Sequence, residues 1–461
     1  MGEEQEQKFH QLTEEPVSRV ISHLAVPCII SMLVTAFYNM ADTFFVGMLR
    51  SNAATGAVGV VFSMMAVIQA VGFFFGHGSG NFISRELGRR NTDSASNMAA
   101  TGFFSALFTG LLICVFGEIF LTPLAAFLGS SPTILPYAKD YLRVILIGAP
   151  WMTASLVLNN QLRFQGNAIY GTIGIASGAV LNIGLDLACI IVFDMGVFGA
   201  AFATVFSQGV AGVGSLLYIL RHYHELRWSK DEGAFSLPHC AKLCSMGIPM
   251  GLQCSITAIG SVVLQGAVNG LGSDIVAAQT AGSKAAQFLC VPLESIGTAM
   301  TTYASQNMGA HDLKRVDRGV YTALGIGCVY SVASFLILRF TDKLLIGLFL
   351  EAKETAIMAN AQSFIFWNSV FYIPLAVLII YRYTIQGLGY SGLAMFAGVA
   401  EMIARAMVGF WFVPLWGYFA ACIASPVAWF FACFFLIPAY IVVRKRLQNE
   451  KQADAQQAAR A

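Results

Sequence analysis

Hydrophobic residues occupy most of the chain in long runs, and short polar or glycine-rich stretches separate these runs. A helix needs about 20 apolar residues to cross the hydrocarbon core of a bilayer. Twelve runs meet that length, and they cover residues 20–47, 53–76, 97–120, 138–161, 169–193, 197–220, 243–270, 275–303, 319–345, 362–388, 391–413 and 417–443. The pattern predicts an all-α polytopic membrane protein with twelve transmembrane helices.

Composition strengthens this prediction and narrows the function. Of 461 residues, 57% are hydrophobic and only 11% are charged, whereas soluble domains carry about 25% charged residues. The net charge of +2 is too small to indicate a nucleic-acid partner, so we expect the lipid bilayer as the main surroundings. No catalytic signature such as H-E-x-x-H, G-x-S-x-G or a phosphate loop occurs, and we expect neither an enzyme nor a bound cofactor.

Cysteine and signal patterns add little. The ten cysteines include no C-x-x-C pair, and Cys240 and Cys244 beside His239 are the nearest approach to a metal cluster. We interpret these thiols as small apolar packing residues. The first 15 residues are polar and acidic, unlike a cleaved signal peptide, so we expect the first hydrophobic helix to direct its own insertion.

Lys and Arg in the short connections gather on one side of the predicted helices, which marks that side as cytoplasmic. The residues on this side are Lys8, Arg19, Arg85, Arg89, Arg90, Arg221, Arg227, Lys230, Lys314, Arg315, Arg318, Arg444, Lys445 and Arg446. Both termini are therefore predicted to be cytoplasmic, which requires an even number of spans and agrees with twelve.

Many residues recur 221 positions later, which indicates an internal duplication. Examples are Gly76 and Gly297, Gly88 and Gly309, and Gln165 and Gln386. The chain is predicted to form two pseudo-symmetric six-helix bundles. These are an N-lobe over residues 1–220 and a C-lobe over 241–461, joined by a polar cytoplasmic linker over 221–240. Because six is even, both lobes have the same topology, and this arrangement suits alternating access.

Acidic and polar residues inside the N-lobe helices are the candidate functional residues. Asp42 lies in the first span, where an acid costs about 2.5–3.5 kcal/mol on insertion scales and usually faces a cavity. Asn182 and Asp186 are four residues apart and share one face of the fifth span. Thr204 in the sixth span can add a hydroxyl. Such groups can share a proton, form an oxygen site for Na⁺, or simply hydrogen-bond helices together.

The repeat restricts this chemistry to one lobe. At an offset of 221 or 222, Asp42 corresponds to Val263 or Leu264, and Asp186 corresponds to Met407. The acidic pair therefore has no counterpart in the C-lobe, and any ion coupling is predicted to lie in the N-lobe.

Other polar residues could line a substrate pocket or could equally connect helices. The candidates for the pocket are Tyr38, Asn39, Asn159, Gln253 and Glu294. Glu401 and Arg405 are four residues apart, and we interpret them as a structural ion pair. Arg163 and Arg382 are expected to extend toward the membrane surface or to anchor helices rather than bind substrate.

Pro27 lies 15 residues before Asp42 in the first span, which is roughly 22 Å along a helix. A proline frees a backbone carbonyl and permits a bend. The helix could therefore kink or straighten with the protonation state of Asp42, or it could carry a static kink. Pro249, at an offset of 222, indicates that the kink belongs to the scaffold that both lobes share.

The ordered set of motifs resembles the multidrug and toxic compound extrusion (MATE) family, and is most similar to its bacterial DinF-like branch. The motifs are YNMADTFFVG, SRELG, RFQG, NIGLD, GVFGAAFATV, SQNMGA and QGLG, in this order along the chain. The resemblance implies a monomeric antiporter of the bacterial inner membrane that exports drugs and organic cations in exchange for H⁺ or Na⁺.

The resemblance also implies roles for individual residues. It assigns cation coupling to Asp42, Asn182, Asp186 and Thr204, and it places Tyr38 and Asn159 near the N-lobe pocket. One branch of the family also uses acids in helices 7 and 10, but here helix 7 offers Gln253 and the span 362–388 has no carboxylate. The alternative is a lipid-linked oligosaccharide flippase of the related superfamily. It would need a basic cavity, whereas the charges within these spans are mainly acidic.

Overall fold

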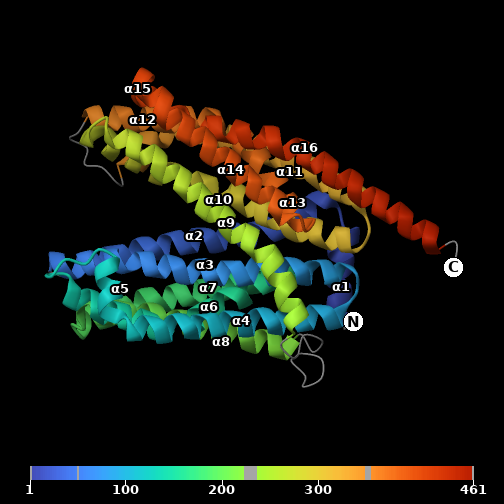
Figure 1. The fold of residues 1–461 in the computed structure, drawn as a ribbon, viewed down its shortest axis with the longest axis horizontal. Helices are drawn as coiled ribbons and strands as arrows, with labels where there is room; N and C mark the ends of the chain where they lie inside the picture. Colours follow the sequence, from blue (N-terminus) through green and yellow to red (C-terminus); the bar gives the residue numbers. More distant parts are fainter. Residues whose placement is uncertain (1–2, 49–50, 223–235, 348–354, 459–461) are drawn as a thin grey trace. The chain divides into compact units, whose positions relative to one another are not determined.

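A computed structural model describes residues 3–48, 51–222, 236–347 and 355–458, which form helices joined by short turns (Figure 1). The elements in chain order are α1 (Glu3–Glu14), α2 (Val17–Gly47), α3 (Asn52–Gly88), α4 (Thr92–Ile119), α5 (Leu121–Phe127), α6 (Leu135–Phe164), α7 (Ala168–Asp186), η1 (Leu187–Val192), α8 (Gly196–His222), α9 (Leu237–Asn269), α10 (Ser273–Gly309), α11 (Leu313–Ile346), α12 (Thr355–Val370), α13 (Tyr372–Gly387), α14 (Ser391–Met407), η3 (Val408–Phe412), α15 (Val413–Trp416) and α16 (Tyr418–Ala458). The short segments η1 and η3 are π-helical.

The long helices confirm the predicted all-α polytopic fold. Within the described residues, 10 helices are long and apolar enough to cross a membrane, or up to 11 if the bent pair α12 and α13 forms one span. Those two helices meet at 54°, where the sequence predicts one straight helix over 362–388. The remaining long helix, α10, has 37 residues. Its sequence contains the charged residues Lys284 and Glu294, and with this helix the arrangement is consistent with twelve helices in two lobes.

The bounds of the elements repeat with the same offset as the residues. Helices α3 and α10 each have 37 residues, and both their first and last residues lie 221 positions apart. Helices α4 and α11 begin with that offset, and so do the π-helical segments η1 and η3. The duplication therefore extends to the secondary structure, including irregular turns that the sequence pattern does not predict.

The chain divides into two compact units. Unit 1 comprises Met1–Phe9 and Val26–Gly251, and unit 2 comprises His10–Ala25 and Leu252–Ala461. Helices α2 and α9 each contribute a segment to both units, and in both helices the division lies within two residues of a proline, Pro27 or Pro249. Most of the predicted linker over 221–240 lies outside the described residues.

Buried helix α6 organises unit 1. It packs against α3, α4, α7 and α8, and it is buried along most of its length. The approach of α4 depends on Gly110, because a Cβ there would lie 2.5 Å from Pro150 Cα and 2.9 Å from the Ala149 carbonyl oxygen. Both neighbours are backbone atoms of α6, which cannot move aside as a flexible side chain can.

We expect Gly110→Ala to lower the free energy of unfolding by about 1–3 kcal/mol, because the added methyl group must push α4 away from α6. Thermal unfolding of the purified protein in detergent, followed by circular dichroism, measures this loss. Gly214→Ala on α8 is the matched control, since nothing lies within 4 Å of the added carbon. Equal melting temperatures for the two variants would show that this contact between the helices is not tight.

Hydroxyl groups hold α10 against α13 in unit 2. The Thr301 hydroxyl donates to the Tyr383 carbonyl at 3.1 Å, and the Ser305 hydroxyl donates to the Gly387 carbonyl at 2.9 Å. A Cβ on Gly387 would lie 2.6 Å from the Thr301 carbonyl oxygen, so the two backbones are in direct contact. This contact fixes the position of the polar side chains that α13 carries.

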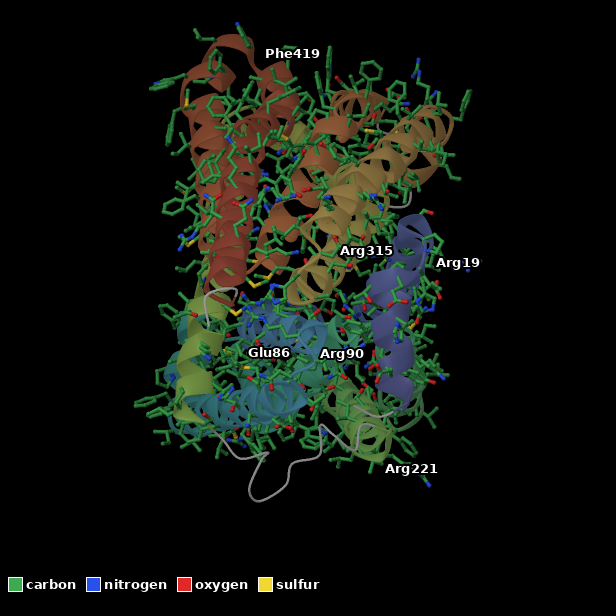
Figure 2. All side chains as sticks on the ribbon, turned by 90° about the vertical axis from the view of Figure 1, so that its right-hand side faces the viewer. Arg19, Glu86, Arg90, Arg221, Arg315 and Phe419 are labelled. Atoms are coloured by element: carbon green, nitrogen blue, oxygen red, sulfur yellow. The ribbon has the colours of Figure 1, made fainter. Side chains whose placement is uncertain are left out.

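Basic residues predicted to set the orientation lie at helix ends (Figure 2). In unit 1, Glu86 near the end of α3 accepts a hydrogen bond from Arg89 at 2.8 Å, and Arg90 pairs with Glu6 at 3.2 Å. In unit 2, Arg315 near the start of α11 donates to the backbone carbonyl of Glu15. These side chains anchor helix ends, and the cytoplasmic location of the termini stays a prediction.

Candidate functional site

The two acids of the predicted coupling site come together in unit 1. Asp42 lies on α2 and Asp186 is the last residue of α7, close enough for their charges to interact directly. Asp186 is fully buried, and Asp42 is partly buried with its Oδ1 atom inside the protein. Neither Asp186 oxygen nor Asp42 Oδ1 has a hydrogen-bond partner among the described residues.

Asn182 and Thr204 extend this group. Asn182 lies one turn before Asp186 on the same face of α7, and its buried amide oxygen and nitrogen also lack partners within the described part of the chain. Thr204 on α8 is buried and donates its hydroxyl to the Ala200 carbonyl in its own helix, at 3.1 Å. The Asp42, Asn182 and Asp186 side chains therefore contribute five buried polar atoms without a partner.

Tyr141 on α6 also belongs to this cluster, although the sequence pattern did not predict it. Its ring is fully buried, and its hydroxyl lies 3.7 Å from Met65 Sδ. The same hydroxyl lies within reach of the Thr204 side chain and interacts with the charges of Asp42 and Asp186. A tyrosine near the end of a predicted span is typical of a membrane interface, so no local signal distinguished it.

The five unpaired atoms give the cluster its chemistry. A buried polar atom without a hydrogen bond is costly, and a buried charge without a partner is far more so. A proton shared by the two acids would remove one negative charge. Alternatively, a hard cation such as Na⁺ would bind the carboxylate, amide and hydroxyl oxygens that Asp42, Asp186, Asn182 and Thr204 carry. The chemistry of these side chains thus suits either a shared proton or a hard cation.

The π-helical turn after Asp186 belongs to the scaffold and not to the acid. Segment η1 follows Asp186 directly, and π turns are frequent at functional sites. In unit 2, however, η3 follows Met407 in the same way. Because the turn is present where the acid is absent, it positions the end of the helix in both halves.

The other N-lobe candidates lie in different surroundings. Tyr38 is partly buried and interacts with the charge of Asp42, one turn further along α2, whereas Asn39 is exposed. Asn159 is not part of the acid cluster. Its amide nitrogen donates to the Ser155 carbonyl at 3.0 Å, and its oxygen accepts from the Ser215 hydroxyl at 3.4 Å. In this structure Asn159 therefore connects α6 to α8.

Helix α2 is fastened around Pro27 to two neighbouring helices. The Pro27 carbonyl accepts a hydrogen bond from the Thr172 hydroxyl of α7 at 2.7 Å. One turn later, the Ser31 hydroxyl accepts one from Arg163 Nη2 of α6 at 2.8 Å. Arg163 is buried, so of the two expected roles it does not extend to the membrane surface but anchors α2 to α6.

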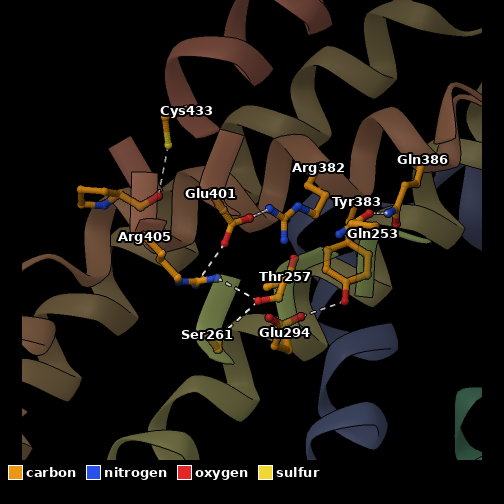
Figure 3. Close-up of polar contacts among 11 residues, drawn as sticks. Gln253, Thr257, Ser261, Glu294, Arg382, Tyr383, Gln386, Glu401, Arg405 and Cys433 are labelled. Carbon is orange, nitrogen blue, oxygen red and sulfur yellow. Dashed lines mark hydrogen bonds and ion pairs between the residues drawn. The ribbon is translucent and has the colours of Figure 1, made fainter. Parts of the chain in front are cut away.

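Unit 2 contains a buried ion triad in place of unpaired acids (Figure 3). Glu401 of α14 pairs with Arg405 at 3.3 Å, which confirms the predicted ion pair, and also with Arg382 of α13. All three side chains are buried. Arg382 therefore does not extend to the membrane surface as expected, because Glu401 holds it inside the unit. The periodicity of α14 alone predicts only the partner on the same helix.

The two C-lobe candidates for a substrate pocket lie near this triad (Figure 3). Glu294 of α10 is partly buried and accepts a hydrogen bond from the Tyr383 hydroxyl at 2.8 Å. Gln253 of α9 is buried and accepts one from Gln386 at 2.7 Å. Both side chains therefore have a hydrogen-bond partner within unit 2, unlike the acids of unit 1.

Known proteins share both the sequence and the fold. The sequence model of the MatE family matches residues 27–188 and 249–411. The Staphylococcus haemolyticus multidrug export protein MepA is 24% identical over 78% of this chain and 82% of its own. An FAD transporter of Shewanella oneidensis is 24% identical over 81% of this chain and 82% of its own.

A solved structure supports the fold independently. An outward-facing multidrug resistance MATE family transporter of the MOP superfamily superimposes with a TM-score of 0.86 at 22% identity, covering 96% of this chain and 98% of that one. The two matched sequence segments begin at Pro27 and Pro249 and together cover most of the chain. The chain therefore belongs to the MatE family.

Proposed function

We propose that the protein is a secondary antiporter that exports organic cations, including drugs, in exchange for H⁺ or Na⁺. The observation that carries this proposal is the set of five buried polar atoms without partners on Asp42, Asn182 and Asp186. A purely structural acid would have its oxygens paired within the protein, as both Glu401 oxygens are. Membership of the MatE family supports transport, and the name of the S. haemolyticus relative supports drug export.

The exchange follows from competition for negative charge. Asp42 and Asp186 carry up to two charges that no basic residue in their cluster neutralises, so a cation must bind there in at least one conformation. A ligand shifts a conformational equilibrium only by binding one state more tightly than the other. We propose that H⁺ or Na⁺ favours one arrangement of α2 and that the cationic cargo favours the other. Each then displaces the other during the transport cycle.

The sign of the buried charges supports a cationic cargo. The cluster in unit 1 is acidic, whereas the two arginines of unit 2, Arg382 and Arg405, are matched by Glu401 and Glu294. Unit 1 also buries Arg163, but one arginine does not outnumber Asp42 and Asp186 there. The described residues of neither unit thus offer the surplus of buried basic groups that a pyrophosphate would need, which argues against a lipid-linked oligosaccharide flippase. The S. oneidensis relative is named an FAD transporter. FAD is therefore the alternative cargo against which an organic cation should be tested.

Individual residues take separate roles in this exchange. We propose that Tyr38 and Asn39 of unit 1 contact the cargo, and that Asp42, Asn182, Asp186 and Thr204 hold the coupling ion. The protein would act as a monomer in a bacterial plasma membrane, with both termini in the cytoplasm.

Reconstituted vesicles test the exchange directly. We expect an imposed H⁺ or Na⁺ gradient to drive movement of a fluorescent organic cation against its concentration gradient, and to drive no movement of FAD. Vesicles without protein and vesicles without a gradient are the controls. Equal transport with and without both gradients would contradict coupling. Gradient-driven movement of FAD alone would contradict the cationic cargo.

A further inference from the structure

Arg339 of α11 is an exposed charge on a largely apolar face, one turn before the exposed Lys343. The exposed apolar neighbours on this helix are Val329, Val332, Leu336, Phe340 and Leu344. Arg339 is itself exposed and makes no ion pair or hydrogen bond with another residue in the described ranges. An arginine on the lipid-facing side of a membrane helix needs an anion or water at its end.

The position of Arg339 along α11 places it toward one end of the helix. The helix has 34 residues, which is about 51 Å at 1.5 Å per residue. Arg339 lies about 39 Å from its start, or about 13 Å from its middle. Half the hydrocarbon thickness of a bilayer is about 15 Å. The guanidinium thus lies toward one end of the apolar stretch of α11, where a long basic side chain can extend to a lipid phosphate.

A cavity opens beside this arginine between α11 and α12. Its volume is about 370 Å³, and its lining includes Arg339, Asp342, Gln362, Phe335 and Phe366. Asp342 Oδ2 accepts a hydrogen bond from Gln362 Nε2 at 2.9 Å, so the carboxylate is held in place. The ring centroids of Phe335 and Phe366 lie 6.1 Å apart, and those of Phe366 and Trp367 lie 5.5 Å apart. The cavity thus combines a cation, an anion and an apolar wall.

The internal repeat places a charge of opposite sign at the corresponding position of unit 1, and that charge is paired inside the protein. The residue 221 positions before Arg339 is Glu118 of α4, and it pairs with Arg143 of α6 at 3.5 Å. The position of Arg143 in unit 2 is occupied by Phe364, which is buried and apolar. Unit 1 therefore pairs the charge at this place internally, whereas unit 2 leaves a cation for a ligand from outside.

We propose that this cavity binds the head group of phosphatidylethanolamine from the surrounding leaflet. The guanidinium of Arg339 takes the phosphate, for which its planar set of donors is suited. The carboxylate of Asp342 accepts hydrogen bonds from the primary ammonium group. The acyl chains leave along Phe335, Phe366 and the exposed apolar face of α11. Phosphatidylcholine lacks ammonium hydrogens, and phosphatidylglycerol lacks the positive charge, so both fit less well.

Lipid titration of the purified full-length protein tests the site. Each lipid is added to protein stripped of lipid in detergent, and bound lipid is counted by native mass spectrometry. We expect phosphatidylethanolamine to bind more tightly than the other two lipids. Arg339→Gln should weaken it by about tenfold or more, the equivalent of 1.4 kcal/mol. Asp342→Asn should remove the preference for phosphatidylethanolamine over phosphatidylcholine without abolishing binding of either lipid.

Matched variants make the outcome decisive. Lys343→Gln removes an exposed charge next to Asp342 that does not line the cavity, so it should leave lipid binding unchanged. Arg339→Lys keeps a point charge and should retain more affinity than Arg339→Gln. Equal affinity of the wild type and Arg339→Gln would overturn the proposal. Displacement of the lipid by an equal concentration of soluble phosphoethanolamine would overturn the assignment to a membrane lipid.

Discussion

Asp186→Asn should reduce ion-driven exchange to the level of vesicles without protein, while the amount of protein in the membrane stays unchanged. Asparagine has nearly the shape of aspartate, but it neither binds a proton at neutral pH nor carries the negative charge that attracts a cation. Asp186 is fully buried and its two oxygens have no hydrogen-bond partner among the described residues. Because an unpaired buried charge is costly, the melting temperature of this variant should equal or exceed that of the wild type.

The companion and control variants separate coupling from folding. Asp42→Asn should cause the same loss of exchange, since its charge interacts with that of Asp186. Asp194→Asn is the matched control, because it changes an exposed acid in the turn between η1 and α8 and should leave exchange intact. Wild-type exchange in either Asp42→Asn or Asp186→Asn would contradict the proposed coupling site.

Glu401→Gln should lower the free energy of unfolding by about 3–5 kcal/mol, the cost of breaking a buried ion pair by removing one partner. The variant leaves Arg382 and Arg405 buried close together without the acid that pairs with both. Thermal unfolding in detergent measures the loss. Glu450→Gln is the control, because it breaks only an exposed pair with Arg446 and should leave the melting temperature nearly unchanged.

A triple variant tests the physical reason for that loss. Replacing Arg382, Glu401 and Arg405 together with apolar side chains of similar volume removes the unpaired charges as well as the triad. Such replacements are often neutral or stabilising, so the triple variant should recover most of the stability that Glu401→Gln loses. A wild-type melting temperature for Glu401→Gln alone would show that water or other residues satisfy both arginines.

These two predictions express one difference between the halves of a duplicated chain. In unit 1 the acids Asp42 and Asp186 have buried oxygens without partners, whereas in unit 2 the acids Glu401 and Glu294 are paired. Substituting Asp42 or Asp186 should therefore cost function and spare stability, whereas substituting Glu401 should cost stability first. The scaffold is shared, down to the π-helical turns at Leu187 and Val408, but the use of buried charge is not.

Features that depend on neighbouring residues along the chain could be predicted from the amino-acid sequence alone. The membrane helices are predicted from the length of the apolar runs. The duplication is predicted from residues that recur once, 221 positions later. The shared face of Asn182 and Asp186 follows from helical spacing. Asp42 could be predicted as a functional candidate because an acid in an apolar membrane helix costs free energy wherever that helix packs. Each of these signals lies within one helix or in a comparison of the chain with itself.

Contacts between residues of different helices are visible only in the tertiary structure. It brought Tyr141 to the acid cluster, paired Arg382 with Glu401, buried Arg163 against Ser31, and placed Asn159 away from the acids. It also bent the predicted span over 362–388 by 54°. Helix periodicity shows which face a side chain occupies, but not which neighbouring helix that face contacts. Partners for buried polar groups are therefore set by packing between helices, because that packing alone fixes their distances.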